Sequence, residues 1–363
     1  MSLATHLSPH LGRASSTSLR FTQATLHKSQ TLNPRLLRNT RAFSSSSPNL
    51  DPRLTGRTCM ITGGSSGIGY AIAERFLQEG AERVILVGRS YKRLLDASRR
   101  LDPGSRELST DKDVATRTPE EDRQLDIDTG CTESQTASDV KQNGALVRSS
   151  ERISLLVGDV ADIGGWMKVL EGELESTDVL INAAGLSISK VLAKSEPEDI
   201  SLILRTNLEA AILTSRALLR ASIRARIKNR KSPSSENKSA PSKCIINISS
   251  LLAMKSGSGA VPYAASKAGL LGLTRSLAVE SAATLKDVVV RSNAIVPGYI
   301  ETPMIAANVD EDFSEGETTR LKESIPLRRF GDPREVADAA VFLAQNEYAN
   351  NCVLNLDGGL SAV

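Results

Sequence analysis

The amino-acid sequence predicts an α/β fold: a single doubly wound domain in which a parallel sheet is covered by helices on both faces. Three observations predict it. A short apolar run at 58–62 leads into a glycine-rich turn, and the turn leads into a stretch at 70–77 with helical spacing of its apolar residues. A second largely apolar run follows at 83–89, and a third lies at 153–157 without polar alternation. Apolar strands that alternate with helices indicate a parallel sheet that is buried on both faces.

The turn after the first strand has the spacing Gly-x-x-x-Gly-x-Gly. Glycines let a backbone approach a pyrophosphate closely, and the N-terminus of the next helix offers free N–H groups and the positive end of the helix dipole. We therefore expect this turn to bind a dinucleotide, although an ordinary glycine-rich loop has a similar composition. The expected contacts are Gly63, Ser65, Ser66, Gly67, Ile68 and Gly69.

The second strand ends at Gly88 and Arg89. In dinucleotide folds this position meets the adenine ribose, where an acidic residue binds the 2′-hydroxyl of NAD and an arginine accommodates the 2′-phosphate of NADP. Arg89 is suited to phosphate through its planar fork of donors. The sequence therefore predicts NADP(H) as the cofactor; the alternative is that Arg89 is a solvent-exposed charge.

Tyr263 and Lys267 lie four residues apart, on one face of a predicted helix. An unperturbed phenol has a pKa near about 10, and a neighbouring ammonium favours the phenolate. The pair therefore suits general acid/base catalysis, with Lys267 expected to lower the pKa of Tyr263. Taken alone, the pair also fits a core tyrosine beside a solvent-exposed lysine.

Together these segments resemble the short-chain dehydrogenase/reductase family. That family carries Thr-Gly-x-x-x-Gly-x-Gly, then Asn-x-Ala-Gly, then a Ser thirteen residues before Tyr-x-x-x-Lys. This chain has the first motif at 62–69, the second at 182–185, then Ser250, Tyr263 and Lys267. The resemblance runs from about 54 to about 360 and implies a Rossmann-type domain over 54–363.

The resemblance implies the catalytic roles. Tyr263 would protonate the substrate carbonyl oxygen as hydride arrives, while Lys267 would also hold the nicotinamide ribose. Ser250, rather than Ser249, has the spacing to hydrogen-bond the carbonyl oxygen. Asn207 matches the asparagine that anchors a water of the proton relay.

Further cofactor contacts come from the same resemblance. Asp159 and Val160 match the pair that brackets the adenine. The motif at 182–185 contributes Asn182, Ala183 and Gly185. The loop after a later strand would hold the nicotinamide carboxamide through Pro297, Gly298, Ile300 and Thr302.

Within the family, the stretches at 263–270, 298–304 and 325–331 are similar to β-ketoacyl-acyl carrier protein reductases, although reductases of sugars, steroids and xenobiotics share parts of them. The similarity implies a homotetramer with the helix at 263–280 in an interface. One departure is Asn350-Asn351, where relatives usually carry Thr-Gly. It puts the local turn in doubt, not the active site.

The first fifty residues contain no Asp or Glu and six basic residues, with many Ser and Thr. This composition is typical of an organelle transit peptide, and 41–45 resembles a mitochondrial processing site. We expect a disordered transit peptide at 1–45 and the mitochondrial matrix as the destination; a basic tail or plastid import are the alternatives. Cleavage would change the net charge from +3 to about −3, which gives no argument for nucleic-acid binding.

All three histidines, His6, His10 and His27, lie in that leader. A mature chain without histidine excludes His-based acid/base catalysis and His-ligated zinc. The four cysteines are scattered, without a Cys-x-x-Cys, and fit reduced thiols rather than a disulfide framework or a metal site. No stretch has the roughly 18 consecutive apolar residues of a membrane helix. We expect no metal, no nucleic-acid partner and no membrane span.

Three segments are read as insertions. Residues 102–150 are rich in Asp, Glu, Ser, Thr and Gln without apolar periodicity, so we expect disorder, with inert elaboration favoured over a regulatory or docking role. Residues 228–243 are basic and rich in Pro and Ser, which indicates a loop. Residues 308–319 are acidic and fall where relatives carry a mobile lid over the substrate.

The leading hypothesis is an NADPH-dependent reductase of mitochondrial fatty-acid synthesis that acts on 3-oxoacyl-acyl carrier protein. Because acyl carrier proteins are acidic, Lys243 and Lys286 are candidate docking residues, with solvated surface lysines as the alternative. The competing enzyme hypothesis is a reductase of small carbonyls, quinones or free acids. A non-catalytic scaffold is the third hypothesis, and it predicts damage to the Ser-Tyr-Lys set, which is intact here.

Overall fold

The computed structural model describes residues 52–103, 143–231, 242–255, 257–285, 288–305 and 315–363. The expected leader at 1–45, most of the first insertion (104–142), Lys286 and residues 306–314 lie outside them. In the described part of the chain, no helix is both long and apolar enough to cross a membrane.

One sheet runs through the described domain in the order β3-β4-β2-β1-β5-β6-β7-β8. Neighbouring strands pair in parallel except β3 and β4, which are antiparallel. Apart from the edge strand β3, the chain winds outward from β1 in one direction and from β5 in the other, so the strand order reverses between β1 and β5. This is the doubly wound arrangement, and it confirms the predicted fold class. The strands are β1 (Thr58–Thr62), β2 (Arg83–Gly88), β3 (Ala145–Arg148), β4 (Ile153–Val157), β5 (Val179–Asn182), β6 (Lys243–Ile248), β7 (Val290–Pro297) and β8 (Val353–Leu356).

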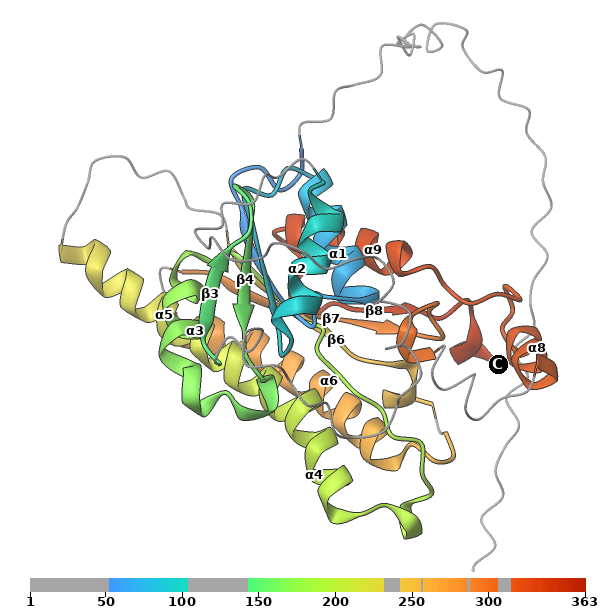
Figure 1. Ribbon diagram of the computed structural model, residues 1–363. Coiled ribbons are helices and arrows are strands. Elements are labelled where there is room, and N and C mark those ends of the chain that lie inside the picture. The colour runs from blue at the N-terminus through green and yellow to red at the C-terminus, as the bar shows by residue number, and fades with distance from the viewer. Residues whose placement is uncertain (1–51, 104–142, 232–241, 256, 286–287, 306–314) are drawn as a thin grey trace, which may run out of the picture. The chain divides into compact units, whose positions relative to one another are not determined.

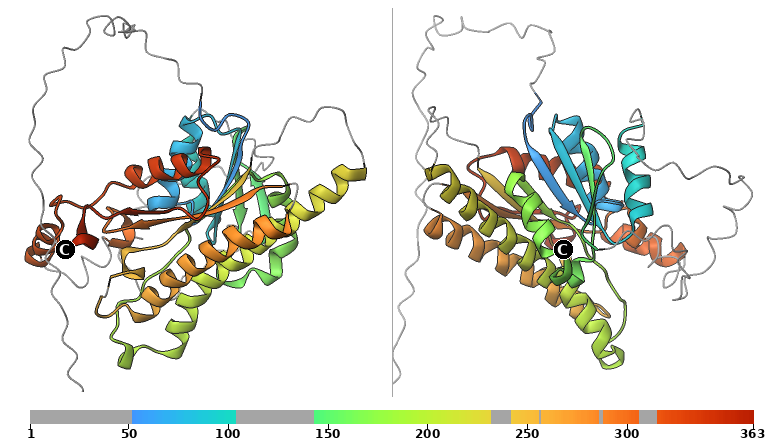
Figure 2. Two further views of the ribbon diagram at one scale, coloured as in Figure 1. Left: turned by 180° about the vertical axis from the view of Figure 1, so that it is seen from behind. Right: turned by 60° about the vertical axis from the view of Figure 1, so that its left-hand side comes forward.

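Helices cover both faces of the sheet (Figure 1). The face shared by α1, α2 and α9 is opposite the face covered by α3, α5 and α6, and Figure 2 shows α5 and α6 side by side from two directions. The helices are α1 (Gly67–Gln78), α2 (Tyr91–Leu101), α3 (Met167–Ser176), α4 (Pro197–Leu204), α5 (Ala210–Lys231), α6 (Val261–Thr284), α8 (Glu315–Ser324) and α9 (Pro333–Gln345). A π-helical turn, Arg205–Glu209, joins α4 to α5, and short 3₁₀ helices cover Val160–Asp162, Gly164–Trp166, Leu192–Lys194, Leu251–Ala253 and Leu360–Ala362.

Successive residues of each strand pack into opposite layers of the core, as the period of two in a strand requires. In β1, Cys59 and Ile61 face the layer of α1 and α9 and belong to the same core cluster as Phe76 and Val341. Met60 faces the other layer. Because both faces are covered, the central strands β1, β2, β4 and β5 are largely apolar, which is the pattern that predicted the fold.

The insertions differ in part from the expectation. Residues 145–148, expected to be disordered within 102–150, form β3 against β4, so the end of that insertion is ordered. The short apolar run Ala-Leu-Val is compatible with a strand. The long polar stretch before this run led to the prediction of disorder for the whole insertion. The expected loop at 228–243 is shorter, because α5 continues to Lys231 and β6 begins at Lys243.

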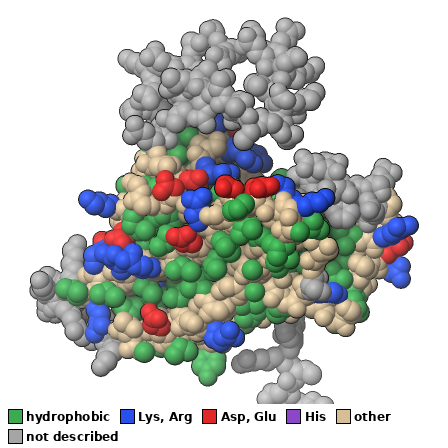
Figure 3. Space-filling model, turned by 90° about the horizontal axis from the view of Figure 1, so that it is seen from below, with side chains coloured by type: hydrophobic (Ala, Val, Ile, Leu, Met, Phe, Trp, Pro, Cys, Tyr) green, Lys and Arg blue, Asp and Glu red, His purple; other side chains and the backbone are tan. Residues whose placement is uncertain are grey.

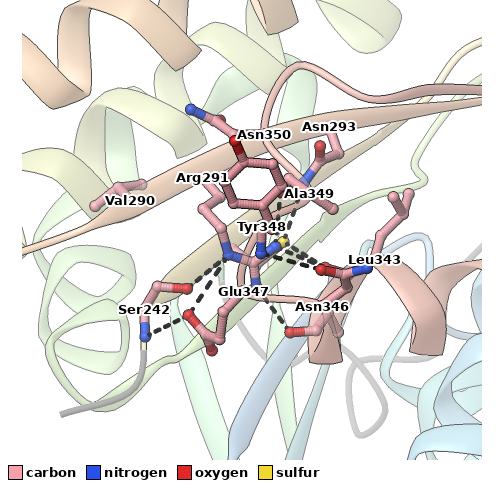
Figure 4. A network of polar contacts seen from close by, with 12 residues as sticks. Ser242, Val290, Arg291, Asn293, Leu343, Asn346, Glu347, Tyr348, Ala349 and Asn350 are labelled. Atoms are coloured by element: carbon pink, nitrogen blue, oxygen red, sulfur yellow. Dashed lines mark hydrogen bonds and ion pairs between the residues drawn. The ribbon is translucent and has the colours of Figure 1, made fainter. Parts of the chain in front are cut away.

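A buried arginine joins α9 to the start of β7 (Figure 4). Arg291 is 1% exposed, and its guanidinium donates to the backbone carbonyls of Leu343, Ala344 and Ala349 at 2.7–2.9 Å. Carbonyls in the last turn of a helix have no intrahelical partner, so the cation both satisfies them and complements the helix dipole. The half-exposed carboxylate of Glu347 lies 3.8 Å from Arg291.

The Asn350-Asn351 pair forms an ordered turn. Asn351 has φ +57°, the left-handed region in which a glycine is easily accommodated and asparagine is the tolerated substitute. The Asn350 Oδ1 accepts a 3.0 Å hydrogen bond from the Ser292 amide, and its Nδ2 donates to Ala278. The departure from Thr-Gly therefore keeps the turn.

Candidate active site

The predicted site residues follow the carboxyl ends of the parallel strands. The glycine turn follows β1, Gly185 follows β5, Ser250 follows β6 and Pro297 ends β7. Ligands of doubly wound sheets bind at this edge, in the crevice where the strand order reverses. That crevice lies between β1 and β5, so topology alone brings the glycine turn and the 182–185 motif together.

The glycine turn is packed too closely for side chains. Gly63 has φ +69°, and a Cβ there would lie 2.8 Å from the Ala184 Cα. A Cβ on Gly69 would overlap the carbonyl oxygen of Gly63. Thr62 ties the two loops together, since its Oγ1 accepts hydrogen bonds from the Ala183 and Ala184 amides, both at 3.2 Å. Thr62 belongs to the recognised motif, but its role as a link between two strands could not be seen from spacing.

The N-terminus of α1 fits an anionic ligand. Ser66 is extended and its side chain caps no N–H group, and the first turn of α1 carries no acidic residue. The helix therefore presents free amides and positive dipole beside the glycine turn, which matches a pyrophosphate. Gly67 faces Thr302, since a Cβ on Gly67 would lie 3.4 Å from the Thr302 Cγ2. The glycine turn and the predicted nicotinamide loop are thus neighbours.

The residue that follows β8, Asp357, packs closely against the predicted nicotinamide loop. A Cβ on Gly298 would lie 2.8 Å from the Asp357 Cα, which leaves room there for glycine alone. Ile300 is 5% exposed and packs into the core, so only its backbone is available to a ligand. Pro297 is also buried. The loop offers backbone groups and the Thr302 side chain.

Helix α6 brings the catalytic candidates together. Tyr263 lies in its first turn, and the hydroxyl of Tyr263 is hydrogen-bonded to Ser250, which lies after β6. Lys267 is one turn further on, with its Nζ 5.6 Å from the centre of the Tyr263 ring. Ser249 is turned away, since its Oγ donates to the Lys267 backbone carbonyl at 2.8 Å. The structure therefore places Ser250, and not Ser249, at the Tyr263 hydroxyl; the contact of Ser250 with a substrate carbonyl stays a prediction.

The direction of the pKa shift at Tyr263 differs from the prediction. Burial raises the pKa of Tyr263 above its usual 10, and the hydrogen bond from Ser250 opposes this only in part. Lys267 does not offset it here: burial lowers the pKa of Lys267 itself, from 10.5 to about 8. Sequence spacing identified the pair, but it could not reveal that both groups are desolvated, which disfavours their charged forms.

Asn207 is 2% exposed and lies in the π-helical turn. Its Oδ1 accepts from the Leu186 amide at 2.9 Å, and its Nδ2 donates to the Leu186 carbonyl at 3.0 Å and to the Ser266 Oγ at 3.1 Å. A Cβ on Gly185 would lie 3.2 Å from the Lys267 Nζ and 3.4 Å from the Asn207 Oδ1. Asn207 therefore fixes the Gly185 loop beside Lys267; its part in a water relay stays a prediction.

The side chain of Asn182 is hydrogen-bonded within the protein interior. It is buried and exchanges hydrogen bonds with Asn247 and Thr214, both at 2.8 Å. The side chain points into the helix-covered interior, so a cofactor can reach only the backbone of Asn182. The sequence did not reveal this, because the partners Thr214 and Asn247 lie 32 and 65 residues away in the chain.

The predicted adenine end lies at β2 and β4, which pair in register with Gly88 beside Val157. Arg89 follows β2 and is exposed. Asp159 follows β4, and its carboxylate accepts the Ala161 amide at 2.9 Å. The two predicted adenosine contacts therefore end adjacent strands.

Lys243 does not lie at this edge. It is the first residue of β6, and its ammonium donates to the Glu175 and Thr177 backbone carbonyls. The amino end of β6 is opposite the catalytic edge, so within one chain the structure does not support docking through Lys243. Among the described residues no group of three or more His, Cys, Asp or Glu could hold a metal ion.

A dinucleotide cradle at the point of strand-order reversal, beside a serine, a tyrosine and a buried lysine, defines a dinucleotide-dependent oxidoreductase. Comparison with family models agrees with this class. The model described as "short chain dehydrogenase" matches residues 57–121, and the model described as "Enoyl-(Acyl carrier protein) reductase" matches residues 129–361. The chain belongs to the short-chain dehydrogenase family.

The match to relatives with assigned activities covers nearly the whole length of each relative. The chain is 32% identical over 304 residues to 3-oxoacyl-[acyl-carrier-protein] reductase of Bos taurus, covering 84% of this chain and 98% of the relative. It is 31% identical, with the same coverage, to carbonyl reductase family member 4 of Danio rerio. Among solved structures, a putative NAD(P)-dependent gluconate 5-dehydrogenase from Beutenbergia cavernae with bound NADP has a TM-score of 0.63 and 27% identity, covering 86% of this chain and 100% of the other.

Proposed function

We infer that this chain is an NADP(H)-dependent 3-oxoacyl-acyl carrier protein reductase of mitochondrial fatty-acid synthesis. The observation that carries the reductase assignment is the convergence of Ser250, Tyr263 and Lys267 beside the Gly185 loop, which packs against the glycine turn. Similarity to the bovine 3-oxoacyl-[acyl-carrier-protein] reductase supports the substrate class. The exposed Arg89 after β2, together with NADP in the Beutenbergia structure, supports the cofactor.

The residues fit the cofactor. Gly63 and Gly69 leave room for a pyrophosphate at the uncapped N-terminus of α1, and Arg89 ends the strand that would meet the 2′-phosphate. NADPH, when bound, supplies the hydride.

The side chains supply the proton. Ser250 and Tyr263 donate hydrogen bonds to the carbonyl oxygen as it gains negative charge, and Tyr263 then transfers its proton. A raised pKa keeps Tyr263 protonated at neutral pH, which suits an acid. Lys267, with a pKa of about 8, is charged at neutral pH and can replace the lost proton.

The assay that tests this proposal is NADPH oxidation with three substrates: an acetoacetyl thioester on acyl carrier protein, a quinone and a simple ketone. The expected result is a kcat/KM for the carrier-linked substrate at least about a hundredfold above the other two. Equal or greater rates with quinone or ketone would favour reduction of small carbonyls, which the similarity to carbonyl reductase family member 4 supports as the second candidate. Full function of a Tyr263→Phe protein in a null strain would favour the scaffold.

The assembly in this proposal is a homotetramer with α6 in an interface. Exposed apolar side chains on α5 and α6 support it, and Figure 3 shows hydrophobic side chains gathered in a band on the side where these helices lie in Figure 1. Val279 on α6 is 70% exposed, and Ile227 on α5 is 52% exposed. Light scattering should give four chains, and Val279→Glu should yield smaller species; a monomeric wild type would contradict the assembly.

The proposed location is the mitochondrial matrix, and the composition of residues 1–45 supports it. Fusion of these residues to a fluorescent protein tests it. Mitochondrial fluorescence, with loss of the leader, is the expected result. A diffuse signal or a plastid signal would overturn the location without affecting the enzymatic proposal.

A further inference from the structure

Strand β3 runs beside the adenine end of the candidate site. It forms with β4 the only antiparallel pair among the described strands, with Ala145 opposite Val157 and Arg148 opposite Ser154. Continuing this register by two residues places Asn143 opposite Asp159. The contact is present: the Asn143 Oδ1 accepts a 3.3 Å hydrogen bond from the Asp159 amide.

Asp159 is held at each of its polar groups. Asn143 binds its amide, and the Trp166 Nε1 donates to its carbonyl at 3.2 Å. Its carboxylate accepts the amide of Ala161 at 2.9 Å. The Asp162 amide also donates to the Asp159 carbonyl, at 3.0 Å within the turn. Asn143 and Trp166 are thus the two side chains that reach the backbone of Asp159 in addition to the turn's own hydrogen bonds.

Trp166 also packs against Gly144, the residue that follows Asn143. The indole is 2% exposed and lies against Gly158, where a Cβ would come within 2.5 Å of the ring. Gly144, with φ +89°, packs against the base of the same side chain, where a Cβ would lie 3.0 Å from the Trp166 Cβ. The Gly144 amide donates to the Val157 carbonyl at 2.7 Å. The hairpin and the turn that carries Asp159 thus pack around one tryptophan.

We propose that Asn143 is a positioning residue for the adenosine end of the cofactor, acting through the Asp159 amide. The inference rests on the proposed function, in which Asp159 and Val160 bracket the adenine of NADP(H). A strand that only covers the edge of β4 would need no hydrogen-bonding side chain at position 143. The two roles therefore predict different effects of removing that side chain.

The test compares Asn143→Ala with Ser149→Ala. Ser149 lies at the other end of the same hairpin and accepts a 2.7 Å hydrogen bond from the Ser98 hydroxyl, so each variant removes one hydrogen bond of one hairpin. Calorimetry gives Kd for NADPH and for adenosine 2′,5′-bisphosphate, and steady-state kinetics give kcat at saturating NADPH. Fluorescence of Trp166, the single tryptophan of the chain, checks that the hairpin is intact.

Asn143→Ala should weaken both ligands by about twofold to tenfold, the usual net effect of one hydrogen bond, with kcat within twofold of wild type. Ser149→Ala should change neither Kd by more than twofold, and Asn143→Asp, which keeps an acceptor, should bind more tightly than Asn143→Ala. An unchanged Kd in Asn143→Ala, an equal loss in Ser149→Ala, or a parallel fall in kcat would overturn the inference while the proposed function stands. A wild type that binds neither ligand would overturn the proposed function first.

Discussion

The ammonium of Lys267 donates a 2.9 Å hydrogen bond to the backbone carbonyl of Ile248, the last residue of β6. Lys267 is 4% exposed, and burial lowers its pKa to about 8. A neutral carbonyl partner orients the ammonium without stabilising its charge as strongly as a carboxylate would. The lysine is therefore poised to exchange a proton close to neutral pH.

This placement predicts the pH dependence of the reduction. Reduction of a carbonyl takes up a proton, and Lys267 carries one below pH 8 and loses it above. The kcat/KM with saturating NADPH should therefore fall as the pH rises through about 8. A profile from pH 6 to 10, with samples returned to pH 7 to exclude denaturation, measures this. A rate that stays flat to pH 9.5 would contradict the role of Lys267.

Lys267→Met should inactivate the enzyme and stabilise the fold. The pKa of Lys267 is lower in the folded state, so between about 8 and 10.5 the unfolded chain binds more protons and stability rises with pH. At pH 7 the buried charge lowers stability, and Met removes it at similar volume. We expect a Tm higher by about 2–4 °C at pH 7, for roughly 1 kcal/mol. The Tm difference between Lys267→Met and wild type should shrink toward pH 10. A lower Tm of the variant at pH 7 would show that the hydrogen bond to Ile248 stabilises the fold by more than the buried charge destabilises it.

Tyr263→Phe removes the proposed proton donor and little volume. We expect turnover to fall by about 10²–10⁴-fold, since a positioned acid has that effect, while NADPH binding survives. Stopped-flow rates and a separate NADPH titration measure the two properties. Tyr348→Phe is the matched control, because Tyr348 is 98% exposed and should retain full activity. More than a tenth of normal activity in Tyr263→Phe would refute the assignment.

Arg89→Ala should change the cofactor preference rather than the chemistry. Loss of the guanidinium removes a partner for the 2′-phosphate, which NADH lacks. The ratio of kcat/KM for NADPH to that for NADH should fall about tenfold or more, with the NADH value little changed. Arg334→Ala, an exposed arginine on α9, should leave the ratio as it is. A wild-type preference for NADH of tenfold or greater would refute the prediction of NADP(H).

Arg291→Met should strongly destabilise the domain. The substitution leaves the Leu343, Ala344 and Ala349 carbonyls without the cation that binds them, and unsatisfied buried groups are costly. We expect a loss of about 3–5 kcal/mol in chemical unfolding. Arg329→Met, which breaks an ion pair with Glu335 whose side chains are about half exposed, should cost far less, because solvent screens that pair. Equal losses would show that the burial of Arg291 is unimportant.

The active-site motifs were predictable because their signals are local. A glycine turn between an apolar strand and a helix, or Tyr263 one helical turn before Lys267, depends on residues that are neighbours in the chain. Even so, local motifs carried only partial information about the roles of individual residues. Asn182 and Ile300 both lie in motifs that match the family. The side chain of Asn182 is nevertheless hydrogen-bonded to residues from distant segments, and that of Ile300 is buried in the core.

By itself, the sequence determined the doubly wound fold, the glycine cradle and the Ser250-Tyr263-Lys267 set, since apolar periodicity and short-range spacing are written in consecutive residues. Only the tertiary structure decided the upward pKa shift at Tyr263, the ordered strand β3 and the contact of Asn143 with Asp159. Desolvation and cross-strand hydrogen bonds depend on which distant segments pack around a group, and that packing is a property of the whole fold.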